Sequence, residues 1–231
     1  MKKSVILKIL FLFTCFIALL LFTNAEKYYS NFKRVKKEVD TLVLLTPYVE
    51  VEFSKGQSFS KDFELSEALA QQIFDNSHSL LDKKYTLARL ASPLDSMSEN
   101  ELSDIFSILD SSSKLTELPT PPFIQNRIKS CTNRYLLFIA FNGYYNADFP
   151  PYYRVSGQGS VGIGGGSATS VSIVIHPYTI FFNSDMRVII FDNQDDKIVF
   201  YNKKYSKDTD PRLPKSVEKM TLDILKSVYY K

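Results

Sequence analysis

The pattern of hydrophobic and polar positions is clearest over Val171–Tyr205, near the C-terminal end of the chain. Three runs rich in Val, Ile, Phe and Tyr are separated by the polar segments Asn183–Asp185 and Asp192–Asp196. Apolar runs of this length that alternate with short polar segments are typical of antiparallel strands joined by tight turns. The stretch therefore predicts a meander of three strands.

The earlier part of the chain alternates between strand-like and helix-like patterns. Leu42–Leu45 is a continuous apolar run, typical of a strand covered on both faces. After Pro47, which is expected to bend or break the strand, the alternation in Val49–Phe53 predicts a strand with one exposed face. Ser54–Asp62 is polar around a glycine and is interpreted as a loop. The same criteria predict a helix over Phe63–Leu81, a strand over Tyr85–Leu90, a helix from the Ser98–Glu101 capping box to Leu109, a short helix capped by Thr120, a central strand over Arg134–Asn142 and a closing helix over Pro214–Tyr229.

This order of elements predicts an α+β fold. Helices interleave with strands early and strands follow one another late, which favours one mainly antiparallel sheet with a C-terminal three-strand meander, helices packed on it and a closing C-terminal helix. The length of 231 residues suits a single core, and we expect one domain over residues 41–231. Within it, residues 143–170 are rich in Tyr, Pro and Gly and predict a long loop.

The first 25 residues have the composition of a secretory signal peptide. Lysines near the start are followed by the apolar run Ile9–Phe22 and by small residues before Ala25, after which we expect cleavage. An uncleaved membrane anchor is the alternative, because the apolar stretch counted from Val5 nearly reaches the roughly 20 residues that a span requires. Both interpretations place the protein in an exported location, the periplasm or the cell envelope.

Charge is balanced once this segment is set aside. The chain has 28 basic and 25 acidic residues, and the lysines of the first 25 residues account for the excess. The net charge of zero over the remaining residues argues against nucleic-acid binding. Residues 26–40 form a basic polar tether, which is either solvated or in contact with anionic lipid headgroups. The side chains available for a membrane contact are Lys33, Arg34, Lys36 and Lys37.

The glycine-rich segment does not predict a nucleotide site. Residues 157–162 match the pattern G-x-G-x-x-G, but further glycines at 164–166 prevent the helix that a dinucleotide site requires. The segment is interpreted as a loop or a long hairpin tip. No cofactor is predicted.

Catalytic and metal-binding residues are equally scarce. After the first 25 residues the chain has one cysteine, Cys131, and two histidines, His78 and His176, so neither an internal disulfide nor a zinc-ligand spacing is predicted. A hydrolase would have to bring Ser160 or Asp148 within hydrogen-bond reach of His176. No catalytic residue is therefore assigned.

Aromatic residues gather at the start of the 143–170 segment, beside two prolines. They either pack in the core or form a recognition surface for protein or glycan, since Tyr contributes contact area at a low entropy cost. The candidate binding residues are Tyr144, Tyr145, Phe149, Tyr152 and Tyr153.

The order of elements resembles the α/β domain of bacterial envelope lipoproteins. The strand opening at Leu42–Phe53, the helix over Ser66–Leu81, the strand at Tyr85 and the late sheet followed by a helix are similar to curli-secretion and penicillin-binding-protein-activator lipoproteins. The resemblance implies a non-enzymatic interaction or assembly module whose partner is another envelope protein or a cell-wall component. An envelope hydrolase that uses the glycine-rich loop and a small-ligand-binding domain are the alternatives.

Overall fold

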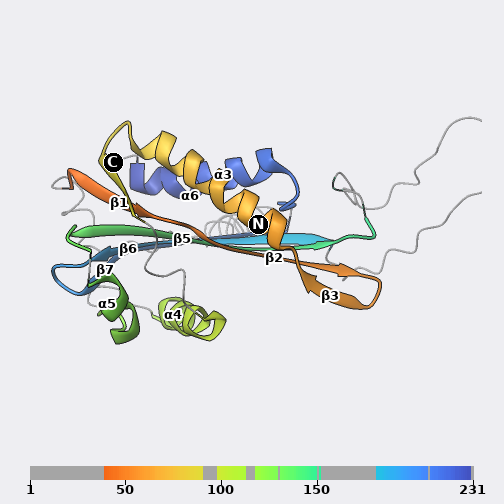
Figure 1. Cartoon of the computed structure of the whole chain (residues 1–231), viewed down its shortest axis with the longest axis horizontal. Helices are drawn as coiled ribbons and strands as arrows, with labels where there is room; N and C mark the ends of the chain where they lie inside the picture. Colours follow the sequence, from red (N-terminus) through yellow and green to blue (C-terminus); the bar gives the residue numbers. More distant parts are fainter. Residues whose placement is uncertain are drawn as a thin grey trace, which may run out of the picture.

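The computed structural model describes residues 39–90, 98–112, 118–129, 131–149, 151, 181–207 and 209–229. These residues form a three-layer arrangement in which one seven-stranded sheet lies between two pairs of helices (Figure 1). The predicted α+β fold is confirmed. The signal segment, residues 26–38 of the basic tether, Tyr152, Tyr153, Ser160 and His176 lie outside the described residues.

Strand β5 (Tyr135–Asn146) is the centre of the sheet. On one side it pairs with antiparallel β6 (Phe182–Asp192), which pairs with antiparallel β7 (Lys197–Ser206). On its other side two strands lie one after the other, both parallel to β5: β1 (Thr41–Leu45) and β2 (Tyr48–Lys55). Strand β4 (Thr86–Leu90) then pairs with β1, and β3 (Ser58–Lys61) with β2. The sheet is therefore mixed, and the predicted break at Pro47 separates β1 from β2.

The two faces of the sheet carry different helices. Helices α3 (Phe63–Leu81) and α6 (Pro214–Tyr229) cover one face, and α4 (Glu99–Ser111) and α5 (Pro122–Ile128) cover the other (Figure 1). Each face has its own buried cluster, which explains why Tyr135–Phe141 is apolar at every position. Alternate residues of this run point to opposite layers, so that Leu137 packs with α3 and α6 while Leu136 packs with α4 and α5.

The helices begin where local sequence signals place them. Asp62 is the N-cap of α3, since its carboxylate accepts a hydrogen bond from the Leu65 amide at 3.0 Å. Ser98 and Glu101 form the predicted capping box of α4. Thr120 does not cap α5, so that prediction was wrong: Pro121 is the N-cap and the buried Thr120 hydroxyl has no hydrogen-bond partner. No helix in the described part of the chain is long and apolar enough to span a membrane.

The last two strands of the predicted meander are β6 and β7, and β5 precedes them in an antiparallel order; the predicted strand that begins at Val171 lies outside the described residues up to position 180. Strand β6 runs without a turn through Asn183–Asp185, where the sequence predicts one. The polar residues are satisfied inside the strand: the buried Ser184 hydroxyl donates to the Thr209 carbonyl at 2.9 Å, and Asp185 pairs with Arg187. The second predicted turn is present, because the chain reverses between Asp192 and Lys197.

Two further boundaries differ from the prediction. Ser54–Asp62 is a β-hairpin rather than a loop, and Gly56 allows its tight turn by adopting a φ of 58°. Strand β5 extends to Asn146, so Tyr144 and Tyr145 belong to the sheet and the predicted loop begins after them.

Candidate functional site

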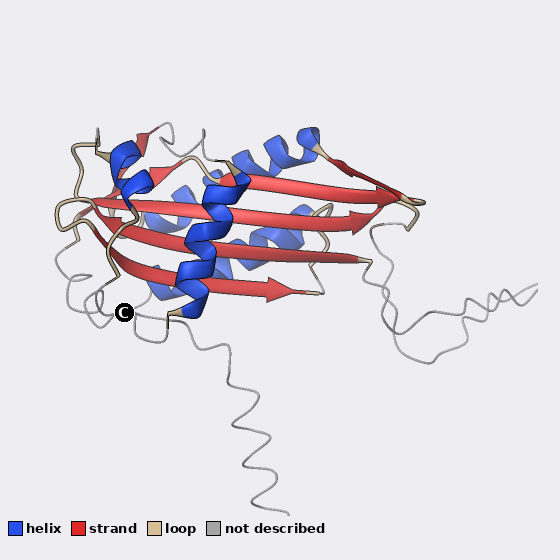
Figure 2. Cartoon of the chain, turned by 90° about the horizontal axis from the view of Figure 1, so that it is seen from below, coloured by secondary structure: helices blue, strands red, loops and turns tan. Residues whose placement is uncertain are grey.

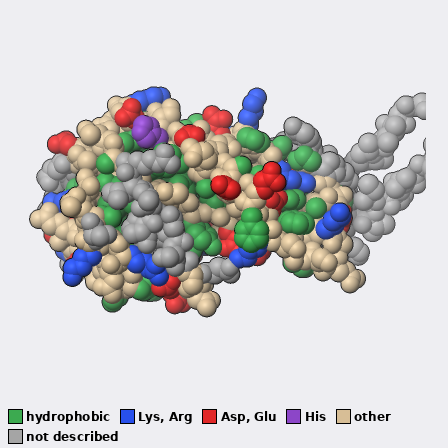
Figure 3. All heavy atoms as spheres, in the orientation of Figure 1, with side chains coloured by type: hydrophobic (Ala, Val, Ile, Leu, Met, Phe, Trp, Pro, Cys, Tyr) green, Lys and Arg blue, Asp and Glu red, His purple; other side chains and the backbone are tan. Residues whose placement is uncertain are grey.

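Helix α4 lies across the strands and, on its own face of the sheet, leaves the strand segments beyond it without a helix among the described elements (Figure 2). Where the helix meets this uncovered part of the sheet, a groove of about 460 Å³ opens to the solvent. We refer to it as the α4 groove. It is lined by Tyr48, Glu50 and Glu52 of β2, Leu102, Ser103, Phe106, Ser107 and Asp110 of α4, Asn142 and Gly143 of β5, and Arg187 of β6. Acidic, basic and hydrophobic side chains are interspersed over the side of the molecule seen in Figure 3.

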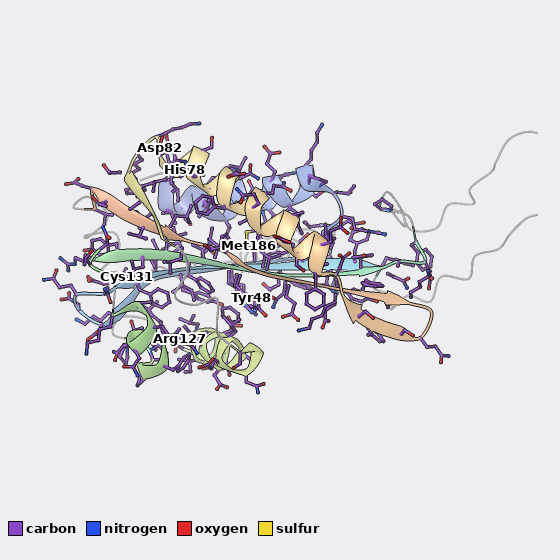
Figure 4. The ribbon with its side chains drawn as sticks, in the orientation of Figure 1. Tyr48, His78, Asp82, Arg127, Cys131 and Met186 are labelled. Carbon is purple, nitrogen blue, oxygen red and sulfur yellow. The ribbon has the colours of Figure 1, made fainter. Side chains whose placement is uncertain are left out.

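The β2 end of the groove is acidic. Residues 48, 50 and 52 point to the same face because side chains alternate along a strand, and Tyr48 lies between the sheet and α4 (Figure 4). The Tyr48 hydroxyl donates to Glu50 Oε2 at 2.7 Å, and Lys61 Nζ lies 2.5 Å from Glu50 Oε1. Glu50 is therefore held on both carboxylate oxygens. Glu52 is exposed, and its carboxylate has no ion pair or hydrogen bond among the described residues.

The β6 end of the groove holds a half-buried ion pair. Arg187 Nη2 lies 2.8 Å from Asp185 Oδ2, and the guanidinium stacks 4.2 Å from the centre of the Phe106 ring. Asp185 Oδ1 and Arg187 Nε are buried and have no hydrogen-bond partner. Burial is the largest influence on Asp185 and raises the pKa of its carboxyl, against the opposing attraction of Arg187.

Asp110 connects the end of α4 to the sheet. Its carboxylate accepts hydrogen bonds from the Tyr201 hydroxyl at 2.7 Å and from Lys203 Nζ at 2.8 Å, and lies 3.7 Å from Arg187 Nη2. Burial acts to raise the pKa of Asp110, but the contacts with Lys203 and Tyr201 outweigh it and lower the pKa. Burial of the Tyr201 side chain, together with its hydrogen bond to the Asp110 carboxylate, raises the pKa of Tyr201. These contacts fix the groove wall against its floor.

The predicted aromatic residues are divided between the two faces. Tyr144 is half-buried on the groove side, where its hydroxyl lies 2.7 Å from Ser54 Oγ. Tyr145 faces the other layer: it stacks on Phe53 with ring centres 5.6 Å apart and donates to Asp62 Oδ2 at 2.7 Å. Burial and this hydrogen bond raise the pKa of Tyr145 to about 12.

Phe149 lies beyond the end of β5 and packs edge-on against Phe181, with ring centres 4.4 Å apart. Thus, of the three predicted aromatic residues that are described, Tyr144 is the one that shares the groove face of the sheet.

The residues considered for a hydrolase or a metal site lie apart from the groove. His78 is exposed on α3, on the opposite face of the sheet (Figure 4). Asp148 accepts a hydrogen bond from the Gly56 amide at 2.9 Å and so braces the β2–β3 hairpin. Cys131 is buried. Within the described ranges, no group of three His, Cys, Asp or Glu residues is placed to hold a metal ion.

Sequence reasoning missed the residues that line the α4 groove. The alternation of Glu50 and Glu52 with apolar residues identified an exposed strand face, which is the one signal that points to them. Arg187 and Asp110 come from distant segments, and only the pairing of β5 with β6 and the packing of α4 bring them together.

Comparisons with known proteins identify no sequence family for this chain. No family model matches it, and no curated protein matches its sequence. Solved structures similar to it include a neuraminyllactose-binding hemagglutinin homolog from Helicobacter pylori, with 10% identity, 83% of each chain covered and a TM-score of 0.41. A second is the lipoprotein GNA1162 from Neisseria meningitidis, with 8% identity, 72% of this chain and 79% of that chain covered, and a TM-score of 0.28. A third is the LpoB C-terminal domain from Salmonella enterica, with 12% identity, 76% of this chain and 94% of that chain covered, and a TM-score of 0.27.

Proposed function

We propose that this protein is a non-enzymatic interaction module of the bacterial cell envelope that binds a partner protein through the α4 groove. The observation that carries the proposal is the groove itself, an open hollow of about 460 Å³ beside a part of the sheet whose α4 face no described helix covers. Open grooves with a few convergent polar groups over a rigid floor are typical binding sites.

The polar groups of the groove support binding. Asn142, Ser103 and Ser107 are exposed, and the side chain of none of them has a hydrogen bond to another described residue. They offer a carboxamide and two hydroxyls to a partner without breaking an existing contact. Glu50 and Arg187, in contrast, are held by neighbouring groups, which keeps the shape of the groove fixed before binding.

The envelope location rests on the N-terminal sequence. Residues 1–25 have the order of a basic start, an apolar core and small residues that directs export, and the basic tether follows. Cell fractionation with N-terminal sequencing tests this part of the proposal. We expect the mature chain in the envelope fraction beginning at Glu26, while recovery from the cytoplasm with an intact Met1 would contradict it.

The binding role is tested in intact cells by photo-crosslinking. A photoreactive amino acid at Asn142, on the groove floor, should form a covalent adduct with a partner, whereas the same residue at the exposed Ser79 of α3, on the other face, should not. Equal adducts from both positions, or none from Asn142, would contradict the proposal.

A further inference from the structure

The charges of the α4 groove are unevenly matched. The cations that line the groove or contact its lining carboxylates are held in ion pairs: Arg187 with Asp185 at 2.8 Å, Lys61 with Glu50 at 2.5 Å and Lys203 with Asp110 at 2.8 Å. Glu52 is left over at the rim, and it is exposed without a cation within the described part of the chain. Among the described residues, Glu52 is therefore the lining carboxylate of the groove that has no ion pair.

The strand register of the β2–β3 hairpin shows where a cation for Glu52 could have come from. Lys61 stands opposite Glu52 in the β2–β3 register, yet its ammonium contacts Glu50 instead. Glu50 is also held by the Tyr48 hydroxyl, so its carboxylate is oriented toward the groove before any partner arrives. A cation that enters beside Glu52 would meet the exposed Glu52 carboxylate and, next to it, the Glu50 carboxylate, which Lys61 and Tyr48 hold in place.

The surroundings of these carboxylates suit a long side chain. The half-buried ring of Tyr48 and the buried Leu102 form an apolar wall next to Glu50. Lys and Arg lay their methylene stems along such apolar surface and keep the charged group at a polar rim. Asn142 and Ser103, which lack partners among the described residues, are available for the backbone of an extended peptide.

We propose, on the basis of the proposed function, that the α4 groove recognises a lysine or arginine side chain of an extended segment of the partner protein. The ammonium or guanidinium lies between Glu50 and Glu52, and the stem lies on Tyr48. Anionic ligands are disfavoured, because Arg187 is already engaged by Asp185 and stacked under Phe106.

The test uses the full chain in a mild detergent and a synthetic probe, the acetylated and amidated peptide Gly-Ser-Lys-Ser-Gly. Binding is followed by NMR, and a peptide with norleucine in place of lysine reports on apolar contact alone. We expect the lysine peptide to shift the amide signals of Glu50, Glu52 and Ser103. Glu52→Gln should weaken binding by about fivefold, as one exposed ion pair contributes up to about 1 kcal/mol.

Glu218→Gln is the matched control, because Glu218 is exposed on α6 and its substitution changes the net charge equally. Equal binding of the lysine and norleucine peptides, or equal effects of the two substitutions, would overturn the inference. The inference would also be overturned if an uncharged sugar such as chitotriose bound in the groove and the lysine peptide did not. If groove crosslinks form in cells while the lysine peptide fails to bind, the inference is overturned and the proposed function stands; if neither occurs, both are overturned.

Discussion

Arg212 Nη1 donates a hydrogen bond to the carbonyl oxygen of Phe149, 2.7 Å away, and so joins the loop after β7 to the chain that leaves β5. The same guanidinium forms two hydrogen bonds with the buried Asp210 carboxylate through Nε and Nη2, and lies 4.6 Å from the centre of the Tyr145 ring. The Asn146 amide in turn donates to the Phe181 carbonyl at 2.7 Å, which brings the ends of the intervening segment together. Arg212 therefore fixes this end of the sheet.

Arg212→Ala is expected to lower the free energy of unfolding by about 3 kcal/mol, because it leaves the Asp210 carboxylate buried without its cation. Urea denaturation followed by circular dichroism measures the change. Arg127→Ala is the control, since the Arg127–Glu101 pair is more exposed to solvent and should contribute less to the free energy of unfolding than the pair with the buried Asp210. A cost for Arg212→Ala no larger than that of the control would show that the clamp does not stabilise the fold.

Gly143→Ala is expected to destabilise the protein through overpacking. A Cβ at this position would lie 2.9 Å from Pro211 Cβ and 3.0 Å from Phe141 Cε1, so a cost of about 1–3 kcal/mol is predicted for the free energy of unfolding. Gly56 provides the contrast, because a Cβ there meets nothing within 4 Å and only its positive φ opposes a side chain. Gly56→Asn should therefore be better tolerated than Gly56→Ala. Thermal unfolding of Gly143→Ala at the temperature of the parent would contradict the packing argument.

The capping box of α4 gives a third prediction. Ser98→Ala removes the acceptor of the Glu101 amide and should lower the free energy of unfolding by about 1 kcal/mol. Ser103→Ala, on an exposed face of the same helix, should cost nothing or stabilise the helix slightly, since alanine has the higher helix propensity. If the two substitutions have the same effect, the cap does not contribute to stability.

The pH dependence of stability reports on Asp185. Its pKa in the folded protein is raised above the ordinary value of 3.8, chiefly by burial. The folded protein therefore holds this proton more tightly than the unfolded chain, and stability falls as the pH rises from 3.8 through the raised pKa. Asp185→Asn lacks the charge, so its free energy of unfolding relative to the parent should increase between pH values of about 4 and 7.

Chemical denaturation at the two pH values measures the free energies of unfolding of Asp185→Asn and of the parent. The prediction is contradicted if the difference between them stays constant, because the attraction of Arg187 then cancels the effect of burial on Asp185. It is also contradicted if the difference shrinks as the pH rises, because that attraction then outweighs burial.

The parts of the fold that the sequence predicts correctly are those with local causes. Helix α3 follows from an apolar stripe, and α4 from a capping box that lies within four residues. The sequence predicts a turn at Asn183–Asp185 because the segment has the composition of a turn, but it lies inside strand β6. Its polar groups are satisfied by Thr209 and Arg187, which are contacts that only the folded chain supplies.

The candidate site was harder to predict for the same reason. Tyr144 and Tyr145 are adjacent in sequence, and strand alternation sends them to opposite faces of the sheet. The α4 groove joins three strands and a helix, and its carboxylates look like ordinary exposed positions when each segment is considered alone. The uncompensated charge of Glu52 becomes visible only when the partner of Lys61 is known.

The most direct test of the account is the yield of photo-crosslinked adduct in intact cells from Asn142, compared with the yield from Ser79. We predict an adduct of defined mass from Asn142, reduced when Glu52→Gln is introduced in the same chain, and no corresponding adduct from Ser79. An adduct that forms equally from the α3 position, or the absence of any adduct from Asn142, would contradict the claim that the α4 groove is the binding surface of this protein.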